Sequence, residues 1–525
     1  MRNKEEKLTV IWRKYQKSKD YMDKKKLVKK TTRNWNFYIG KQWEGCETGG
    51  EELPVLNMIK PVVKYKTAVI SQNQMTAKYS DMNNGGTSEI CEALSAMFDE
   101  SWELSKMTSK IWDVIESAAV QGDSYAFWPT GDTKQSPMIL PNTSVFLGDE
   151  NITDIQEQPY IMIVERLSVP EVRRMARENG LKEDEIDMIS SDNNKDNVIV
   201  NQDEVTDKVT SILFMTKNED GYVEIARSTK NVIYEKQEDL TAKKGEGKSI
   251  VGGLKTYPIV PFIWEKVPFT ARGVSEVEQL IPNQIEVNKT LARRSMTVKM
   301  TAYPRLAYDG TAIQNPEDLE KTGVAIEVNG GAQSVNQMIS YLSTANISGD
   351  ADKLQADLLN LTKDLAGAGD YATGNVNPEQ ASGQAIIAVR DQAQIPLNKQ
   401  IAQFQQFVED VALLYFDLWT TYYTEGLTFG GQTFPIEEVM AVKPSVRVDV
   451  SQDNAWTKLA EQQWADNIFE RQQISFEEYV ELCNSNAVPK AKLQAILEKR
   501  QQMQMPMEQP MEQPMADPMM GMPMM

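Results

Sequence analysis

The longest regular pattern of apolar residues lies between about Ala381 and Thr424. Large apolar side chains recur there at alternating steps of four and three, which is the spacing of one face of an α-helix. The series consists of Leu397, Ile401, Phe404, Val408, Val411, Tyr415, Leu418 and Tyr422. Such a helix would measure on the order of 65 Å, and Pro396 should kink it near its first third. We expect this apolar series either to contact a neighbouring subunit or to pack on the body of the chain.

A second helical pattern covers residues 273–300, "GVSEVEQLIPNQIEVNKTLARRSMTVKM". At 1.5 Å per residue it predicts a helix of about 40 Å, with a kink at Pro282. Glu276 and Glu278 come early, and the basic residues Arg293, Arg294 and Lys299 come late. The helix dipole favours that order of charge.

A compact insert follows this helix, because strand, helix and strand signals occur in turn between residues 301 and 347. Its helix is predicted to begin with Asn315 as the cap and Pro316 at the first position. Helical spacing resumes at residues 348–366.

A polar stretch separates that helix from the longest one. Residues 367–383, "GAGDYATGNVNPEQASG", carry two carboxylates, Asp370 and Glu379, and no cation. Small side chains let a backbone change direction without losing packing, so we expect a long flexible loop between two rigid elements.

The rest of the chain mixes both kinds of secondary structure, so the fold class is predicted to be α+β. One helix should end at Gly122 and lead into a strand from Ser124 to Trp128. The other expected elements are strands at 141–166 and 211–235, a helix opened by Ser168 and Pro170 and closed by Gly180, a surface excursion at the acidic residues 181–208, a hairpin-like region at 427–450 and helices at 453–500.

Composition narrows the possible functions. A chain of 525 residues with 41% hydrophobic content can form roughly two to four domain-sized units with their own cores. No stretch approaches the roughly 18 continuous apolar residues of a membrane span, and the opening "MRNKEEKLTV" lacks the apolar centre of a secretory signal. We therefore expect a protein kept in the cytosol, with no membrane partner.

Histidine is absent from the sequence. Its absence removes the usual general base and the commonest ligand of zinc, copper and iron. We expect no catalytic residues, no metal site, no cofactor and no enzymatic activity. The three cysteines, Cys46, Cys91 and Cys483, are far apart and not in a metal-binding spacing, so they are predicted to be buried free thiols.

Charge is distributed unevenly along the chain. Residues 1–33 contain 13 Lys and Arg against 4 Asp and Glu, a net charge of +9, whereas the whole chain has −19 and the remainder therefore −28. The simplest interpretation of this basic segment is a solvated helix face. Contact with nucleic acid or with an acidic neighbouring subunit is the alternative.

Three local patterns suggest chemistry, and each has a simpler structural explanation. "GEGKS", Gly245 to Ser249, partly matches a phosphate-binding loop, but the earlier glycine that the motif needs is Ala242. A cluster of carboxylates suits a hard cation but fits a solvated helix face better; it comprises Glu92, Asp99, Glu100 and Glu103. Five tryptophans are better explained as core and interface anchors than as base-stacking platforms; they are Trp35, Trp43, Trp102, Trp112 and Trp128.

The last residues, "QQMQMPMEQPMEQPMADPMMGMPMM", repeat Pro and Met. Prolines at that frequency prevent a stable helix or sheet, so residues 501–525 are predicted to be disordered. A thioether site for Cu(I) is the alternative.

The order of these parts resembles the portal proteins of tailed double-stranded DNA bacteriophages. Three phrases agree with that family: "NFYIGKQW" followed by "LPVLNMIKPVVKYKTAVI", then "VPFTARGVSEVEQLIPNQIEVNKTLARR", then "ASGQAIIAVRDQAQIPL". The family forms a ring of twelve chains at one capsid vertex, through which the genome enters and leaves. The resemblance therefore implies a cyclic oligomer and a mechanical rather than catalytic function.

The resemblance assigns a role to each part of the chain. It implies an α+β wing at 1–272 with a basic N-terminal helix, a first stem helix at 273–300, a clip at 301–347, a second stem helix at 348–366, a tunnel loop at 367–383, a kinked tunnel helix at 384–425, wing return strands at 426–452, a helical crown at 453–500 and a disordered tail at 501–525. The Met/Pro tail and the acidic stretch 181–208 do not map onto the family.

Candidate contact residues follow from the same resemblance. Those of the tunnel loop, which would face DNA, are Asp370, Tyr371, Thr373, Asn375, Asn377, Glu379, Gln380 and Ser382. Those of the clip, which would meet the motor or adaptor, are Asp309, Glu317, Asp318, Glu320 and Lys321. Those of the subunit-interface helix are Leu397, Ile401, Phe404, Val408, Val411 and Tyr415.

The implied partners are further copies of the chain, double-stranded DNA in non-specific passage, the terminase large subunit, the major capsid and scaffolding proteins, and head-completion adaptor or tail proteins. The implied location is the portal vertex of the virion, and the host cytoplasm during assembly. Two other functions stay open: a nucleotide-dependent packaging ATPase based on "GEGKS", and a coiled-coil structural scaffold based on the heptad-like apolar series.

Overall fold

The computed structural model describes residues 2–47, 50, 52–82, 88–129, 132–192, 207–237, 254–302, 306–311, 313, 315–321, 323–325, 327–329, 339–341, 349–365, 395–423, 426–429, 432–452 and 466–471. The chain divides into two compact units, Met1–Val450 and Ser451–Met525, and the account below concerns the first. In the second unit residues 466–470 are helical. The predictions for "GEGKS", the loop 367–383 and the Met/Pro tail lie outside the described residues, as do most residues of the predicted crown.

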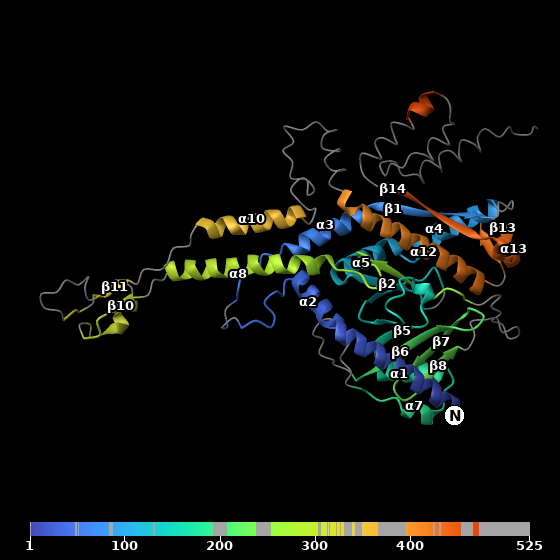
Figure 1. Cartoon of the computed structure of the whole chain (residues 1–525), viewed down its shortest axis with the longest axis horizontal. Coiled ribbons are helices and arrows are strands. Elements are labelled where there is room, and N and C mark those ends of the chain that lie inside the picture. The colour runs from blue at the N-terminus through green and yellow to red at the C-terminus, as the bar shows by residue number, and fades with distance from the viewer. Residues whose placement is uncertain are drawn as a thin grey trace, which may run out of the picture. The chain divides into compact units, whose positions relative to one another are not determined.

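An antiparallel sheet of five strands forms one part of the body (Figure 1). Its strands, in spatial order, are β4 (Val145–Leu147), β5 (Ile161–Ser168), β6 (Lys208–Lys217), β7 (Val223–Ser228) and β8 (Ile233–Gln237). Side chains alternate between the two faces of a strand. Accordingly Ile161 and Ile163 join the main core, whereas Met162 and Val164 join a second cluster on the opposite face.

The basic N-terminal segment covers that opposite face. Helix α1 (Arg2–Lys25) buries Ile11, Tyr15 and Met22 against the sheet, and its other side carries most of the lysines. The chain turns at Lys26, which has φ 56°, and continues as α2 (Leu27–Ile39). The segment is therefore two amphipathic helices, and its solvated face is the side turned away from the sheet.

Part of the predicted surface excursion is ordered structure. Helix α6 (Val169–Glu178) begins and ends as predicted, and a short helix α7 (Glu183–Asp187) follows it. Ile186 and Ile189 have no exposed surface because they pack with Val172 and Tyr234 in a third cluster. The excursion prediction is therefore wrong for residues 181–192, where two apolar side chains among the acidic ones sufficed to attach the segment.

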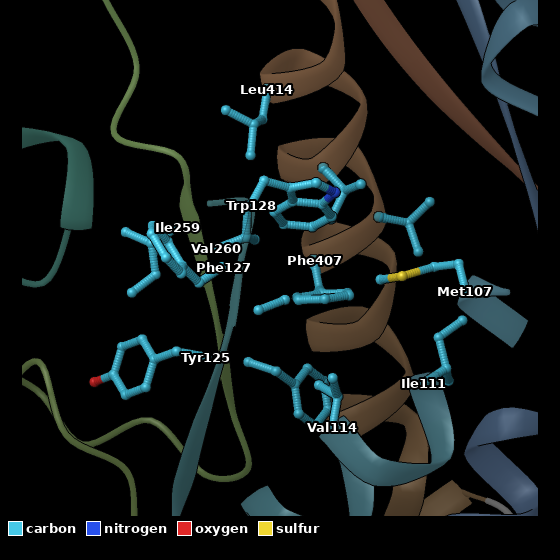
Figure 2. Close-up of a cluster of buried hydrophobic side chains, with 14 of the residues drawn as sticks. Met107, Ile111, Val114, Tyr125, Phe127, Trp128, Ile259, Val260, Phe407 and Leu414 are labelled. Atoms are coloured by element: carbon cyan, nitrogen blue, oxygen red, sulfur yellow. The ribbon is translucent and has the colours of Figure 1, made fainter. Parts of the chain in front are cut away.

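The main core lies between helices and a second antiparallel sheet. The helices are α3 (Ile59–Ser71), α4 (Ser88–Leu104), α5 (Met107–Gln121) and α12 (Asn398–Tyr422), and the sheet has the order β3 (Met138–Pro141), β2 (Asp123–Phe127), β9 (Ile259–Ile263). Figure 2 shows Met107 and Val114 of α5, Phe127 of β2 and Phe407 of α12 converging on one apolar centre. The predicted end of α5 at Gly122 is confirmed, and the strand after it begins at Asp123.

Helix α12 contains the apolar series from the sequence except Leu397, which directly precedes it, and the chain's own body covers the series. Leu397, Phe404, Val408, Val411, Tyr415 and Leu418 are at most 2% exposed, and Ile401 and Tyr422 pack partly buried against the same core. Of the two alternatives, the series packs on the body, so these buried side chains are not available to a second subunit. Pro396 lies in a 3₁₀ turn, η3 (Ile395–Leu397), directly before α12 begins.

A two-stranded ribbon joins segments that are far apart in sequence. Strand β1 (Asn73–Asp81) pairs with β14 (Pro444–Gln452). The predicted return region contains a hairpin, β12 (Leu427–Phe429) with β13 (Gln432–Phe434), and a short helix α13 (Ile436–Ala441) before β14.

The predicted helix pair and insert are present with changed details. Helix α8 (Glu276–Ala302) is followed by β10 (Leu306–Tyr308), a 3₁₀ helix η2 (Pro316–Glu320) and β11 (Ile339–Tyr341), which pairs antiparallel with β10. Asn315 is the N-cap residue and Pro316 the first residue of η2, as predicted, although the Asn315 side chain makes no capping hydrogen bond and the helix is a short 3₁₀ helix. Helix α10 (Gly349–Leu365) then runs back alongside α8 (Figure 1).

One expectation about side chains is corrected, since Cys91 is buried but Cys46 is exposed. Trp112 is 43% exposed, so of the two expected roles, core anchor and interface anchor, it does not have the first. Among the described residues, no helix combines the length and the apolar character needed to cross a membrane.

Candidate functional site: helix α8, its anchor and its neighbours

A buried arginine fixes the segment that leads into α8. The guanidinium of Arg272 donates hydrogen bonds to both carboxylate oxygens of Glu150, to Oδ2 of Asp123 at 3.2 Å and to the carbonyl oxygen of Val145 at 2.7 Å. These partners come from β2, from β4 and from the turn after β4. One side chain therefore ties the start of α8 to both sheets.

In this cluster the positive charge of buried Arg272 is balanced by the nearby carboxylates of Asp123 and Glu150. Burial by itself would lower the pKa of Arg272, but the carboxylates of Glu150 and Asp123 outweigh it and hold that pKa well above its ordinary value. Burial raises the pKa of the Asp123 carboxyl, and Arg272 opposes that rise. A buried cation with several charge-assisted hydrogen bonds is stable only while all its partners are present.

Helix α8 begins immediately after this cluster. Ser275 Oγ accepts hydrogen bonds from the backbone N–H groups of Val277 at 3.0 Å and Glu278 at 3.3 Å, so Ser275 caps the helix. Ser275 also donates to the carbonyl oxygen of Val120 at 2.7 Å. The helix therefore begins at Glu276, three residues later than the pattern suggested, because the cap residue is held by the end of α5.

The first half of α8 is locked to the body by polar contacts. Glu276 is 8% exposed; it forms an ion pair of 2.7 Å with Lys66 and accepts a hydrogen bond from Trp264 Nε1. Further along, Gln284 accepts a hydrogen bond from the backbone N–H of Met58, and Asn288 donates to Gln42. Such contacts give the helix one fixed direction relative to α2 and α3.

The second half of α8 presents its side chains to solvent within the described chain. Its basic residues are exposed: Arg293, Arg294 and Lys299. Its exposed large apolar residues are Met296 at 54%, Val298 at 58% and Met300 at 40%. Met296 and Met300 are four residues apart and share one face of the helix, whereas Val298 lies on the opposite face.

Helix α10 packs on one side of α8. Asn283 Nδ2 donates a hydrogen bond of 3.0 Å to Oγ1 of Thr362, and Thr362 is 2% exposed. Leu361, one residue earlier on α10, is 59% exposed. Two neighbouring positions of α10 therefore differ: Thr362 contacts α8, whereas Leu361 is exposed in the single chain.

A cavity of about 540 Å³ lies between α2, the turn that follows it and α8. Its apolar lining includes Phe37, Trp43 and Ile285. Its basic lining consists of Lys29, Arg33, Lys41 and Lys289, against one carboxylate, Glu44.

The candidate contact residues of the insert are placed on its surface. Asp309 is exposed and accepts hydrogen bonds from the backbone N–H and hydroxyl of Thr311. Glu317 is exposed, and Asp318 forms an ion pair of 2.8 Å with Lys321. Glu320 is the last residue of η2, and its side chain is not among those described.

The described part of the chain covers only some of the predicted site residues. All eight tunnel-loop candidates lie outside the described residues: Asp370, Tyr371, Thr373, Asn375, Asn377, Glu379, Gln380 and Ser382. The six residues assigned to a subunit interface on α12 are core residues or packed against the core. Within the described parts of the chain, no group of three or more Cys, Asp or Glu side chains is placed to hold a metal ion.

Sequence reasoning missed the Arg272 cluster and the cavity beside α8. The phrase "FTARGVSE" carries a weak signal for the cluster, since it places an arginine and a glycine directly before a serine cap. No signal in the sequence marks the partners, because Asp123 and Glu150 reach Arg272 only through the folding of two sheets. The cavity likewise depends on the crossing of α2 and α8.

Comparison with known proteins identifies the class and then the family. The features described above, namely a helix pair anchored in an α+β body and exposed apolar and charged side chains along it, are typical of a protein that assembles with other chains. The family model for phage P22-like portal proteins matches residues 13–429, and the chain belongs to this family. The predicted resemblance to portal proteins is thereby confirmed, and the family is a structural, non-enzymatic component of phage particles.

Other comparisons give weaker similarities. No curated protein matches the chain. One solved structure, of the virion of a native gene transfer agent particle, has 10% identity and a TM-score of 0.35, covering 80% of this chain and 88% of that one. A chain from the neck of an empty gene transfer agent particle has 10% identity and a TM-score of 0.36, covering 82% and 89%.

Proposed function

We propose that the chain closes into a ring of twelve subunits at one capsid vertex, and that double-stranded DNA passes through the ring during packaging and ejection. The observation that carries this proposal is the match of residues 13–429 to the P22-like portal family. In assembly the ring forms in the host cytoplasm with scaffolding and major capsid proteins, and it then stays in the virion.

The described parts of the chain are consistent with such a ring. The first half of α8 is held rigidly by Arg272, Glu276 and Gln284, whereas its second half exposes both apolar and basic side chains. In a closed ring each subunit contacts two neighbours through two different surfaces. An anchored helix with an uncovered outer half suits one of these contacts, and α8 and α10 would form the stem.

We assign the insert at 301–347 to docking of the terminase motor during packaging and of adaptor or tail proteins afterwards. Asp309 and Glu317 are exposed there, and Asp318 and Lys321 are partly or fully exposed as an ion pair. Polar and charged groups at the edge of an interface contribute mainly to specificity and association rate. That suits a surface that exchanges one partner for another.

We assign the passage of DNA to electrostatic repulsion rather than binding. The chain has a net charge of −19, and the proposed tunnel loop 367–383 contains no Lys or Arg. A basic channel would hold the duplex by releasing counterions, which would oppose the sliding of a long genome. Asp370 and Glu379 would keep the phosphates away from the wall.

The alternatives have less support. The scaffold hypothesis depended on the apolar series of α12, and that series is explained by packing on the core of the same chain. The ATPase hypothesis depended on Gly247, Lys248 and Ser249, which lie outside the described residues, and it conflicts with membership of a non-enzymatic family.

Electron microscopy of the purified chain tests the proposal. Class averages viewed along the symmetry axis should contain closed rings with a central hole, and counting subunits in them tests the number twelve. A chain that stays monomeric, or that assembles into filaments, would contradict the proposal. Nucleotide hydrolysis by the same preparation would favour the ATPase instead.

A further inference from the structure

We propose that the basic cavity between α2 and α8 receives α10 of the neighbouring subunit, with Leu361 entering the cavity and Asp357 meeting Lys289. The inference rests on the proposed ring, and it specifies one subunit contact within it. Four observations carry it: the positions of the two surfaces around α8, their heights along it, their charges and their apolar character.

The two surfaces lie on opposite sides of α8. An α-helix turns by about 100° per residue, so measured from Asn283 the cavity residues Asn288, Ile285 and Lys289 lie at about 140°, 200° and 240°. Asn283 itself holds α10 through Thr362. Figure 1 likewise shows α10 and α2 on opposite sides of α8. A chain with α10 on one side and an uncovered cavity on the other has the two unlike surfaces that a head-to-tail ring requires.

The two surfaces also lie at similar heights along α8. Thr362 is level with Asn283, and α10 runs back along α8, so Asp357 lies about 7.5 Å further from the body. Lys289 lies six residues beyond Asn283, which is about 9 Å in the same direction. Leu361 is one residue from Thr362 on α10, and Ile285 is two residues from Asn283 on α8. Because Thr362 and Asn283 are in contact, Leu361 and Ile285 lie within about 3 Å of the same height along α8. Rotation about a ring axis moves a neighbour sideways without changing its height, provided that α8 runs along that axis.

Charge favours this pairing. Helix α10 contains four aspartates, Asp350, Asp352, Asp357 and Asp364, against two lysines. The cavity lining has four cations against one carboxylate, although the chain as a whole is acidic. One of the four, Lys289, also forms a solvent-exposed ion pair of 2.9 Å with Glu286, so Asp357 would share this lysine with Glu286. Complementary charge across an interface fixes its register and excludes wrong partners.

The apolar part of each surface is incomplete in the single chain. Leu361 is 59% exposed, and the cavity is lined by Phe37, Trp43 and Ile285. A leucine that enters such a cavity would lose its contact with water, which favours the association of the two chains. The occupant of the cavity is therefore a second copy of this chain.

Charge reversal tests the contact, with the ring fraction measured by size-exclusion chromatography and light scattering. Lys289→Asp and Asp357→Lys should each lower the ring fraction about tenfold or more, since like charges then face each other in every interface. Lys230→Asp, which changes an exposed lysine in the β7–β8 turn in the same way, should leave the ring fraction unchanged.

Mixing the two single variants gives the decisive result. In an alternating ring, the carboxylate introduced by Lys289→Asp meets the ammonium introduced by Asp357→Lys on the next chain. The interface after it pairs the native Lys289 with the native Asp357, so every contact is again between opposite charges and assembly should recover. The double variant should assemble on its own for the same reason. Recovery in the mixture also establishes that each variant is folded, because an unfolded chain would not be rescued by another.

The outcomes separate this inference from the proposed function. If the wild type and every variant form rings equally well, or if neither the mixture nor the double variant recovers, the contact between α10 and the cavity is wrong while the ring stands. If the wild-type chain forms no ring, the proposed function fails and this contact fails with it.

Discussion

Gly122 and Gly273 approach each other so closely that neither position has room for a side chain. A Cβ atom on Gly122 would lie 2.5 Å from the carbonyl oxygen of Gly273, and one on Gly273 would clash with the carbonyl oxygen of Gly122. Gly122 ends α5 with φ 106°, and its carbonyl oxygen accepts a hydrogen bond from the backbone N–H of Trp264. The end of α5 and the segment before α8 are thus in backbone contact.

We expect Gly273→Ala to destabilise the body by about 1–3 kcal/mol, because the added methyl group forces two backbones apart. Thermal unfolding followed by circular dichroism measures the change. Gly310→Ala serves as the control, since no atom lies within 4 Å of a Cβ built there. Equal unfolding temperatures for the two variants would contradict the prediction.

Replacing Arg272 should be more severe. Arg272→Met leaves the carboxylates of Asp123 and Glu150 buried without a cation, and loss of one partner of a buried ion pair costs about 3–5 kcal/mol. Adding Asp123→Asn and Glu150→Gln to the same chain should restore part of the lost free energy of unfolding, which chemical denaturation measures. No recovery would mean that the packing of the arginine, and not its charge, holds the segment.

The stability of the body should depend on the protonation of Asp410. Burial raises the pKa of Asp410 above its ordinary value, while Gln406 donates a hydrogen bond to it and Asp154, Lys266 and Glu409 also influence it. A raised pKa means that the folded state binds the proton more readily than the unfolded state. This group therefore adds stability as the pH falls from neutral through its raised pKa towards the ordinary value of 3.8.

Asp410→Asn tests that dependence, because the amide resembles the protonated carboxyl. The variant should be more stable than the wild type at pH 7, and the difference should shrink as the pH falls. Chemical denaturation at a series of pH values measures both curves. A constant difference across the series would exclude Asp410 as the titrating group.

Phe404→Asp should prevent folding of the single chain rather than only weaken contacts between subunits. Phe404 is 1% exposed and packs on Phe262 and Phe407, so the substitution removes a large core side chain and buries a charge. The expected loss exceeds about 3 kcal/mol. Leu413→Asp, at a position of the same helix that is 41% exposed, should be tolerated. A folded, monomeric Phe404→Asp chain would instead support the subunit-interface assignment.

Lysine at the two acidic positions of the proposed tunnel loop should slow DNA passage. Asp370→Lys with Glu379→Lys introduces cations that attract phosphates, so we expect a packaging rate several-fold lower with unchanged ring assembly. Packaging rate and packaged genome length measure the effect. The control variant, Asp370→Asn with Glu379→Gln, removes both carboxylates without adding a positive charge, so it distinguishes the two effects. Normal rate and genome length in the lysine variant would count against electrostatic repulsion.

The sequence predicted elements whose signals are local. The end of α5 at Gly122 and the start of α6 after Ser168 were predicted correctly because a single residue determines each boundary. The spacing on α12 correctly indicated one continuous apolar face. It did not indicate which surface covers that face, because a core and a subunit interface impose the same periodicity.

Features that depend on distant segments were not predictable from one sequence. The partners of Arg272 lie 122 to 149 residues earlier in the chain. The pairing of β1 with β14 and the cavity between α2 and α8 depend in the same way on the completed fold. Helix α7 was missed for a different reason: its acidic composition is that of a solvated segment, and only Ile186 and Ile189 show that it is attached.

The ribbon of β1 and β14 has a consequence for how the chain is made. Ser80 donates a hydrogen bond to the carbonyl oxygen of Ser445, a residue that the ribosome adds 365 positions later. At about 5–20 residues per second, β1 waits on the order of tens of seconds without its partner strand. Chains that terminate prematurely before residue 444 therefore keep an open strand edge, which exposes them to quality control before they can contaminate an assembly.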